Sequence, residues 1–202
     1  MRRGARAYDR AYFDRWYRAP ASRVRSPAEL TRLVRFVVAA AEHVLGRPIR
    51  TVLDVGAGEG NWRAPLRAQR RGLVYQGVDP SEYAVARFGR RRNIVLGDLA
   101  SLDELPLAAG YDLVVASGVL NYVGPDALRA ALPRLARRAA GMLYLEIFTA
   151  ADSVVGDTDF APMRPASWYR RALRGAGLVG CGLHCYVPRS LRGQLTQLER
   201  AL

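Results

Sequence analysis

From residue 51 onward, short runs rich in Val, Leu and Ile alternate with segments of helical periodicity. This alternation predicts an α/β fold that is Rossmann-like, with a mostly parallel central sheet and helices on both faces. The expected strands cover residues 51–55, 73–78, 94–96, 111–116, 142–148 and 178–187. The expected helices cover residues 61–70, 81–90, 126–140, 167–175 and 190–201. Ligands of such sheets bind at the carboxyl ends of the strands, so function is expected in the segments that follow each strand.

Two further helices are expected before the first strand. In residues 8–17 the aromatic residues Tyr8, Tyr12 and Trp16 recur at every fourth position and share one helical face. A second helix is expected over residues 26–45, because a capping serine and a proline precede it and a glycine follows it. These two helices could form a lid over the sheet.

The length of 202 residues suits one domain, and no low-complexity linker divides the chain. We therefore expect a single domain over residues 1–202, with an N-terminal helical lid at 1–46 and an α/β core at 47–202. No apolar run is long enough to span a membrane, and the first ten residues lack the apolar stretch of a secretory signal. The expected location is cytoplasmic, without a membrane partner.

The formal net charge is +13, and all 31 basic residues are arginine. A positive excess can indicate a surface for RNA or for an acidic substrate. However, the arginines are spread along the chain, and their use without lysine is typical of a GC-rich bacterial genome. We favour a solvated surface of biased composition, so a nucleic-acid partner is not favoured.

Cys181 and Cys185 fall in the same expected strand, where their spacing would place both on one face. A metal site would need two more soft ligands, and His43 and His184 are the remaining candidates. We therefore expect no metal site, and no disulfide in a reduced compartment.

The first expected strand ends in the run DVGAGEG, residues 54–60. Gly56 and Gly58 would let the backbone turn tightly and approach a ligand closely. The helix that follows offers free N–H groups for an anionic group. A tight turn without a ligand is the alternative, and the carboxylate of Asp54 before the first glycine makes the ligand site more specific.

The next two strands also end in acidic residues. Asp79 follows the glycine run by about 20 residues, where a carboxylate can bind both hydroxyls of a ribose. The alternative is that Asp79 only caps the next helix, which begins near Pro80. Asp98 could accept a hydrogen bond from an adenine amino group, and Leu99 could pack on the ring.

After the fourth strand, Ser117 and Gly118 would border the bound ligand, while Asn121 and Tyr122 would face the reacting group. These residues would place the end of the fourth strand beside the same ligand as the first three strand ends. They extend the predicted site across the first four strands.

Together, these motifs resemble the class I S-adenosylmethionine-dependent methyltransferases over roughly residues 51–148. VLDVGAGEG looks like the glycine motif of that family, GVDPS like its second-strand motif, and GDL like its adenine motif. DLVVASGVLNYV looks like its fourth-strand segment. The resemblance implies S-adenosylmethionine as cofactor and methyl transfer as activity. The predicted cofactor-binding residues are Tyr12, Asp54, Gly56, Gly58, Asp79, Pro80, Asp98, Leu99 and Ser117.

The competing ligand for such a fold is a nicotinamide dinucleotide. Its pyrophosphate is anionic, so a carboxylate at Asp54 would repel it. S-adenosylmethionine carries a sulfonium and an ammonium group, which a carboxylate attracts. This contrast favours the methyl donor.

The candidate catalytic residues are His184, Glu146 and Tyr122. His184 could accept a proton from a hydroxyl or an amine, or could be structural. Glu146, in an apolar strand, could bind a substrate amine or pair with an arginine. Tyr12 could touch the cofactor from the lid, or could pack the first helix on the core.

Two features lie outside the cofactor half. Residues 151–165 form a loop long enough for a substrate lid, and its acids Asp152, Asp157 and Asp159 could bind a cationic acceptor or be solvated. The family normally ends in an antiparallel hairpin of strands six and seven. Because only residues 178–187 read as a strand, the seventh strand is either missing or misplaced.

The predicted function is methyl transfer from S-adenosylmethionine to O, N or C of a small-molecule acceptor. One alternative is an RNA methyltransferase, although the fourth-strand segment lacks the Asn/Asp-Pro-Pro-aromatic motif of amino-directed nucleic-acid methylases. Another is a non-catalytic module that binds S-adenosylmethionine.

Overall fold

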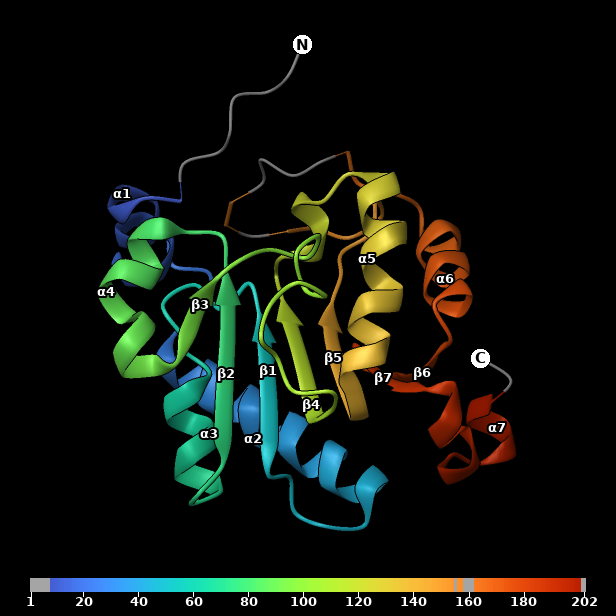
Figure 1. Cartoon of the computed structure of the whole chain (residues 1–202). Helices are drawn as coiled ribbons and strands as arrows, with labels where there is room; N and C mark the ends of the chain where they lie inside the picture. Colours follow the sequence, from blue (N-terminus) through green and yellow to red (C-terminus); the bar gives the residue numbers. More distant parts are fainter. Residues whose placement is uncertain (1–7, 155, 158–161, 201–202) are drawn as a thin grey trace.

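The computed structural model describes residues 8–154, 156–157 and 162–200. Its centre is a seven-stranded sheet in the order β3-β2-β1-β4-β5-β7-β6 (Figure 1). The first five strands are parallel, and β7 and β6 run antiparallel at one edge. The strands are β1 (Thr51–Val55), β2 (Val74–Asp79), β3 (Ile94–Leu96), β4 (Tyr111–Ser117), β5 (Ala139–Glu146), β6 (Leu178–Gly182) and β7 (Cys185–Pro188). The predicted Rossmann-like architecture is confirmed.

Helices cover both faces of the sheet, with α5 in front and α2 behind in Figure 1. The α-helices are α1 (Arg10–Phe13), α2 (Pro27–Leu45), α3 (Arg63–Gln69), α4 (Glu82–Arg92), α5 (Pro125–Arg138), α6 (Ala166–Gly175) and α7 (Gln197–Arg200). A π-helical turn, Asp14–Arg18, continues α1, and short 3₁₀ turns cover Leu120–Tyr122 and Arg189–Gln194. Within the described residues, none of the helices has both the length and the hydropathy of a membrane span.

Alternating side chains of the strands fill two apolar layers. Val52, Leu113 and Val115 face α2 and α3, whereas the neighbouring Leu53 and Val114 face α5 and α6. This period of two explains why the central strands are apolar throughout: each face meets a helix layer. The two layers hold the carboxyl ends of β1, β2, β4 and β5 in fixed positions at one edge.

The C-terminal hairpin corrects the predicted strand at residues 178–187. Leu183 and His184 both have positive φ, +49° and +62°, and separate β6 from β7. The seventh strand is therefore present, and His184 lies in a turn. Cys181 and Cys185 consequently belong to different strands.

Other differences concern element ends. The helix expected at 126–140 ends at Arg138, and the next two residues already belong to β5. The helix expected at 190–201 is divided into a 3₁₀ turn and α7. The strand expected at 142–148 ends at Glu146, so the two residues after it begin the loop beyond the sheet. Pro133 lies inside α5, which continues past it.

The helix expected at residues 26–45 is confirmed as α2. The hydroxyl oxygen of Ser26 accepts a hydrogen bond from the Glu29 backbone N–H, and the Glu29 carboxylate accepts one from Ser26. Gly46 ends the helix with φ +64°. This capping fixes where the chain leaves the preceding segment and turns under the sheet.

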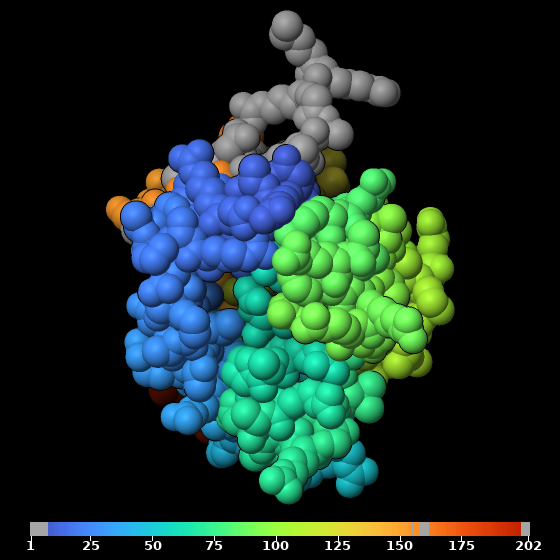
Figure 2. All heavy atoms as spheres, turned by 90° about the vertical axis from the view of Figure 1, so that its left-hand side faces the viewer, coloured from blue at the N-terminus to red at the C-terminus, as the bar shows by residue number. Residues whose placement is uncertain are grey.

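The N-terminal segment, residues 8–25, lies over the carboxyl ends of β1 and β2. Figure 2 shows its first part against the start of α4. Phe13 is 2% exposed and stacks on Tyr83 with 5.7 Å between ring centroids. The Ser81 hydroxyl donates to the Tyr8 carbonyl oxygen at 2.5 Å, and Arg18 forms an ion pair with Glu59 of the glycine run. These contacts dock the segment on the core at three places.

Candidate functional site

Two adjoining cavities lie at the carboxyl edge of the sheet. The larger cavity has a volume of about 410 Å³ and lies over the ends of β1, β2 and β4 and the segment after β3. The smaller cavity has a volume of about 170 Å³ and lies between the N-terminal segment and the ends of β1, β4 and β5. The residues that line both are Tyr12, Tyr17, Gly56, Gly118 and Tyr122. These shared residues mark where the two cavities meet.

The glycine run after β1 forms part of the wall of both cavities. Gly56 has φ +72°, and a Cβ atom there would lie 2.2 Å from Cγ1 of Val119. Gly58 has φ +54°, and its Cβ would lie 3.1 Å from both the Phe13 ring and the Tyr17 hydroxyl. At Gly56 there is no room for a side chain, whereas at Gly58 the neighbouring rings would have to shift by a few tenths of an ångström. The positive φ at both positions also favours glycine.

Asp79 ends β2 on the wall of the larger cavity. Its Oδ2 accepts a hydrogen bond from the Gly58 N–H at 2.6 Å, and its Oδ1 accepts one from the Ser81 N–H at 2.9 Å. Burial raises the pKa of Asp79, and these two N–H donors oppose that rise. The cap of α4 is Ser81, whose hydroxyl accepts from the Ala84 N–H. Asp79 therefore braces the glycine run and faces the cavity rather than serving as the helix cap.

Asp54 is buried at the end of β1 and borders the smaller cavity. Burial raises the pKa of Asp54 to about 7. The Tyr75 hydroxyl donates a hydrogen bond to Oδ2 of Asp54 at 2.6 Å and opposes this rise in pKa, whereas the negative charge of Asp79 adds to it. A buried pair of neighbouring carboxylates is stabilised by a cation between them. The chemistry of these groups thus fits a positively charged ligand.

Asp98, Leu99 and Pro80 all line the larger cavity, and their contact with a cofactor stays a prediction. The Asp98 carboxylate also accepts hydrogen bonds from the N–H groups of Ala100 and Ser101, at 2.9 and 3.0 Å. Asp98 therefore stabilises the turn after β3 that forms this side of the larger cavity. Leu99 is 9% exposed and presents an apolar surface beside it.

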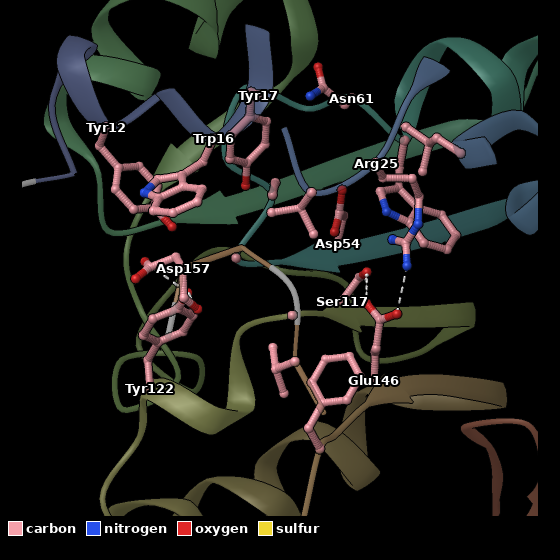
Figure 3. Close-up of a pocket in the computed structure, with 18 residues that line it drawn as sticks. Tyr12, Trp16, Tyr17, Arg25, Asp54, Asn61, Ser117, Tyr122, Glu146 and Asp157 are labelled. Carbon is pink, nitrogen blue, oxygen red and sulfur yellow. Dashed lines mark hydrogen bonds and ion pairs between the residues drawn. The ribbon is translucent and has the colours of Figure 1, made fainter. Parts of the chain in front are cut away.

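Ser117 and Glu146 meet on the wall of the smaller cavity (Figure 3). The Ser117 hydroxyl donates to Oε2 of Glu146 at 2.6 Å, and Arg25 donates to Oε1 at 2.7 Å. Of the two roles expected for Glu146, the pairing with an arginine is confirmed. Sequence reasoning missed Arg25, because no local pattern distinguishes it from the other arginines.

Tyr122 lies where the two cavities meet and donates to Oδ2 of Asp157 at 3.0 Å. Burial and the neighbouring Tyr12 and Asp157 raise the pKa of Tyr122 far above its ordinary value, so its hydroxyl stays protonated. Asp157 comes from the loop after β5 and is 7% exposed.

The other loop acids have different surroundings. Asp152 is exposed and accepts hydrogen bonds from Thr149, while Asp159 lies outside the described residues. Asn121 is buried, lines neither cavity and exchanges two hydrogen bonds with the backbone of Phe148. The expectation that Asn121 faces the reacting group is wrong, because its buried amide is bonded to the loop that follows β5.

His184 occupies the turn between β6 and β7, and its ring packs edge-on against Tyr144 and Phe148. Phe148 lines the smaller cavity, whereas His184 lines neither. Its catalytic role stays a prediction, and the geometry places the ring behind the cavity wall.

A Rossmann-like sheet that ends in an antiparallel hairpin, with a glycine run after β1 and a carboxylate at the end of β2, has the features expected of the class I S-adenosylmethionine-dependent methyltransferases. A family model described as a methyltransferase domain matches residues 14–198. The chain belongs to this family, and is a methyltransferase that uses S-adenosylmethionine. No curated protein matches it by sequence.

Solved structures share the fold at low sequence identity. The chain is similar to the sugar N-methyltransferase from Streptoalloteichus, with 19% identity, 88% of both chains covered and a TM-score of 0.64. It is also similar to magnesium protoporphyrin IX methyltransferase from Synechocystis with bound S-adenosylmethionine, with 22% identity, 85% of this chain and 82% of that chain covered, and a TM-score of 0.61. An amino pentose methyltransferase from Micromonospora echinaspora gives 17% identity, 91% and 98% coverage and a TM-score of 0.60.

Proposed function

We propose that the protein transfers the methyl group of S-adenosylmethionine to a small-molecule acceptor. The observation that carries this proposal is the shared wall of the two cavities, formed by Gly56, Gly118 and Tyr122 together with Tyr12 and Tyr17. The larger cavity would take the adenosine of the donor, and the smaller cavity its amino-acid end and the acceptor. The methyl group would then lie at the junction beside Tyr122.

The donor contacts follow from the chemistry of each wall. Asp79 would bind the ribose hydroxyls, because a carboxylate accepts several hydrogen bonds at once and here already orients Gly58. Leu99 and Pro80 would pack on the adenine, with Asp98 near its amino group. Asp54 would face the ammonium of the methionyl part, whose positive charge would offset the burial and the Asp79 charge that raise the pKa of Asp54.

The donor supplies an electrophilic methyl group, and the transfer is an in-line displacement by the acceptor. The protein's part is to align the two molecules and to exclude water. Tyr12, Trp16 and Tyr17 of the N-terminal segment line the smaller cavity and are positioned to close over it. We propose that this segment is the lid.

The smaller cavity favours a small acceptor over RNA. Its walls carry the carboxylates of Asp54, Glu146 and Asp157, which would repel the phosphates of a nucleic acid. The surface arginines Arg134 and Arg137 are engaged by Asp103. Three structural neighbours are named for acting on a porphyrin, a sugar and an amino pentose, all of which are small acceptors.

The experiment that tests the proposal is calorimetric titration with S-adenosylhomocysteine, followed by incubation with methyl-labelled donor and acceptor mixtures. Binding followed by label transfer to a small molecule supports it. Label transfer to RNA, or a salt-dependent RNA shift together with no small-molecule product, would favour the RNA alternative. Donor binding without any turnover would favour a non-catalytic module.

The pKa of Asp54 predicts that donor binding releases a proton. At a pH below about 7 the Asp54 carboxyl is partly protonated and must ionise to face an ammonium, so affinity should rise by up to about tenfold per pH unit and level off above 7. Without donor, the folded protein binds the Asp54 proton more tightly than the unfolded chain does. The free energy of unfolding therefore falls as the pH rises from 3.8, the ordinary pKa of an aspartate, towards about 7. Titration with S-adenosylhomocysteine in buffers of different ionisation enthalpy measures both affinity and protons released.

The matched variant for this prediction is Asp54→Asn, whose amide oxygen can still accept from the Tyr75 hydroxyl. Its donor affinity should be weaker and independent of pH over this range. A wild-type affinity that is flat between about pH 5.5 and pH 7.5, below the titration of the ligand amine, would contradict the role of Asp54.

The Phe13→Ala variant tests the lid. Phe13 is packed on Tyr83 and beside Gly58, and deleting a buried aromatic side chain loses about 3 kcal/mol of packing. We expect affinity for S-adenosylhomocysteine to fall by about tenfold, because the segment no longer stays docked over the donor. The control is Phe36→Ala, since Phe36 is 39% exposed on α2. Equal affinities for the two variants would exclude the lid role.

A further inference from the structure

We propose that the acceptor is an amine, held as an ammonium by the carboxylate of Asp157 among the aromatic rings of Tyr12, Trp16 and Tyr122. This inference rests on the proposed methyl transfer and specifies its acceptor. It assigns to Asp157 both the binding of the acceptor and the removal of its proton.

The position of Asp157 carries the argument. It is 7% exposed and borders the smaller cavity, where the Tyr122 hydroxyl donates to Oδ2 at 3.0 Å. Figure 3 shows Asp157 between Tyr122 on one side and Tyr12 and Trp16 on the other. A carboxylate among aromatic rings is the environment that stabilises an alkylammonium, through charge pairing and cation–π attraction.

The location of Tyr122 ties this group to the reacting methyl. Tyr122 and Tyr12 line both cavities, so the side chains around Asp157 reach the junction where donor and acceptor must meet. Across the two oxygens of a carboxylate there are about four acceptor positions, so Asp157 can bind the Tyr122 hydroxyl and an ammonium together. An amine nitrogen held there lies on the acceptor side of the junction.

The charges on the cavity wall select the same class of acceptor. Among the described residues, three carboxylates and one guanidinium, that of Arg25, line the smaller cavity. S-adenosylmethionine has one net positive charge, so with donor bound and all acids ionised these described groups and the donor together carry one negative charge. An ammonium neutralises this charge, whereas a carboxylate on the acceptor would double it.

The chemistry balances with these groups alone. The acceptor ammonium gives one proton to the Asp157 carboxylate and becomes a neutral amine. Its nitrogen lone pair forms the bond to the methyl carbon while the bond from that carbon to sulfur breaks, and the sulfonium becomes a neutral sulfide. The product is a methylated ammonium, and Asp157 returns its proton to solvent after release.

The test uses the full chain saturated with S-adenosylhomocysteine and three matched probes: benzylammonium, benzyl alcohol and benzoate. We expect benzylammonium to bind about tenfold more tightly than benzyl alcohol, and benzoate to bind more weakly than both. With S-adenosylmethionine, labelled methyl should appear on the nitrogen of benzylamine. Asp157→Asn should lower the benzylammonium affinity about tenfold, whereas the control Asp152→Asn, at an exposed position of the same loop, should not change it.

The outcomes separate this inference from the proposed function. If wild-type protein fails to bind S-adenosylhomocysteine, the proposed function itself fails. If the wild type binds S-adenosylhomocysteine but either binds none of the three probes or shows no preference for benzylammonium, only the amine inference is overturned. An Asp157→Asn variant with unchanged benzylammonium affinity overturns it as well, and unchanged affinity for S-adenosylhomocysteine in that variant shows that the donor site is intact.

Discussion

The Asp79→Ala variant should bind S-adenosylhomocysteine about 100-fold more weakly than the wild type, because two charge-assisted hydrogen bonds to the ribose are lost. The loss has a second source. Asp79 also accepts the N–H groups of Gly58 and Ser81, so without it the glycine run and the start of α4 lose their common anchor. Calorimetric titration measures the affinity.

The conservative variant Asp79→Asn separates these two sources. Its amide can accept one backbone N–H, so the glycine run should keep more of its shape while the charge towards the ribose is gone. We expect an affinity between those of the wild type and of Asp79→Ala. The surface control is Asp126→Asn, since that side chain is 93% exposed. If Asp79→Ala binds the nucleoside as well as Asp126→Asn does, Asp79 is not a ribose ligand.

The Gly56→Ala variant should lose both stability and donor binding. Its new Cβ would lie 2.2 Å from Val119, and its φ of +72° is unfavourable for any residue with a side chain. Positive φ costs about 1–2 kcal/mol, and overpacking of this kind a further 1–3 kcal/mol. Denaturant unfolding should show a loss of about 2–5 kcal/mol, and no binding of S-adenosylhomocysteine should be detectable if Val119 is displaced into the larger cavity.

Gly72→Ala is the matched control for backbone strain. Gly72 has a similar φ of +79°, but no atom lies within 4 Å of its Cβ position. The difference in free energy of unfolding between the two variants therefore measures the contact with Val119. Equal destabilisation of both variants, with donor binding retained by Gly56→Ala, would contradict a close-packed wall at Gly56.

The cofactor half of the site was predictable because its signals are local. Asp54 and Asp79 lie in the last two residues of β1 and β2, and the glycines and Asp98 come just after strand ends. Parallel strands bring their carboxyl ends to one edge of the sheet. The structure adds what each group contacts. The sequence left open whether Asp79 caps a helix, and the hydroxyl of Ser81 answers that question.

The remaining features depend on distant or unusual geometry. Arg25 pairs with Glu146 across 121 residues of sequence, and no pattern links them. The turn that divides β6 from β7 uses Leu183 and His184 in the left-handed region, which side chains rarely adopt. The π-helical turn at Asp14–Arg18 changes the helical period and places Tyr17 beside Tyr12 at the junction of the cavities; the sequence marks Tyr17 as a residue that could close over the donor, but not this turn.

The N-terminal segment contributes Tyr12 and Tyr17 to both cavities, and it is docked through Ser81, two residues after the acid that ends β2. If this segment is the lid, as we propose, it covers the donor and the acceptor together, because the same two tyrosines line both cavities. A substitution that loosens the segment should then weaken the binding of both molecules.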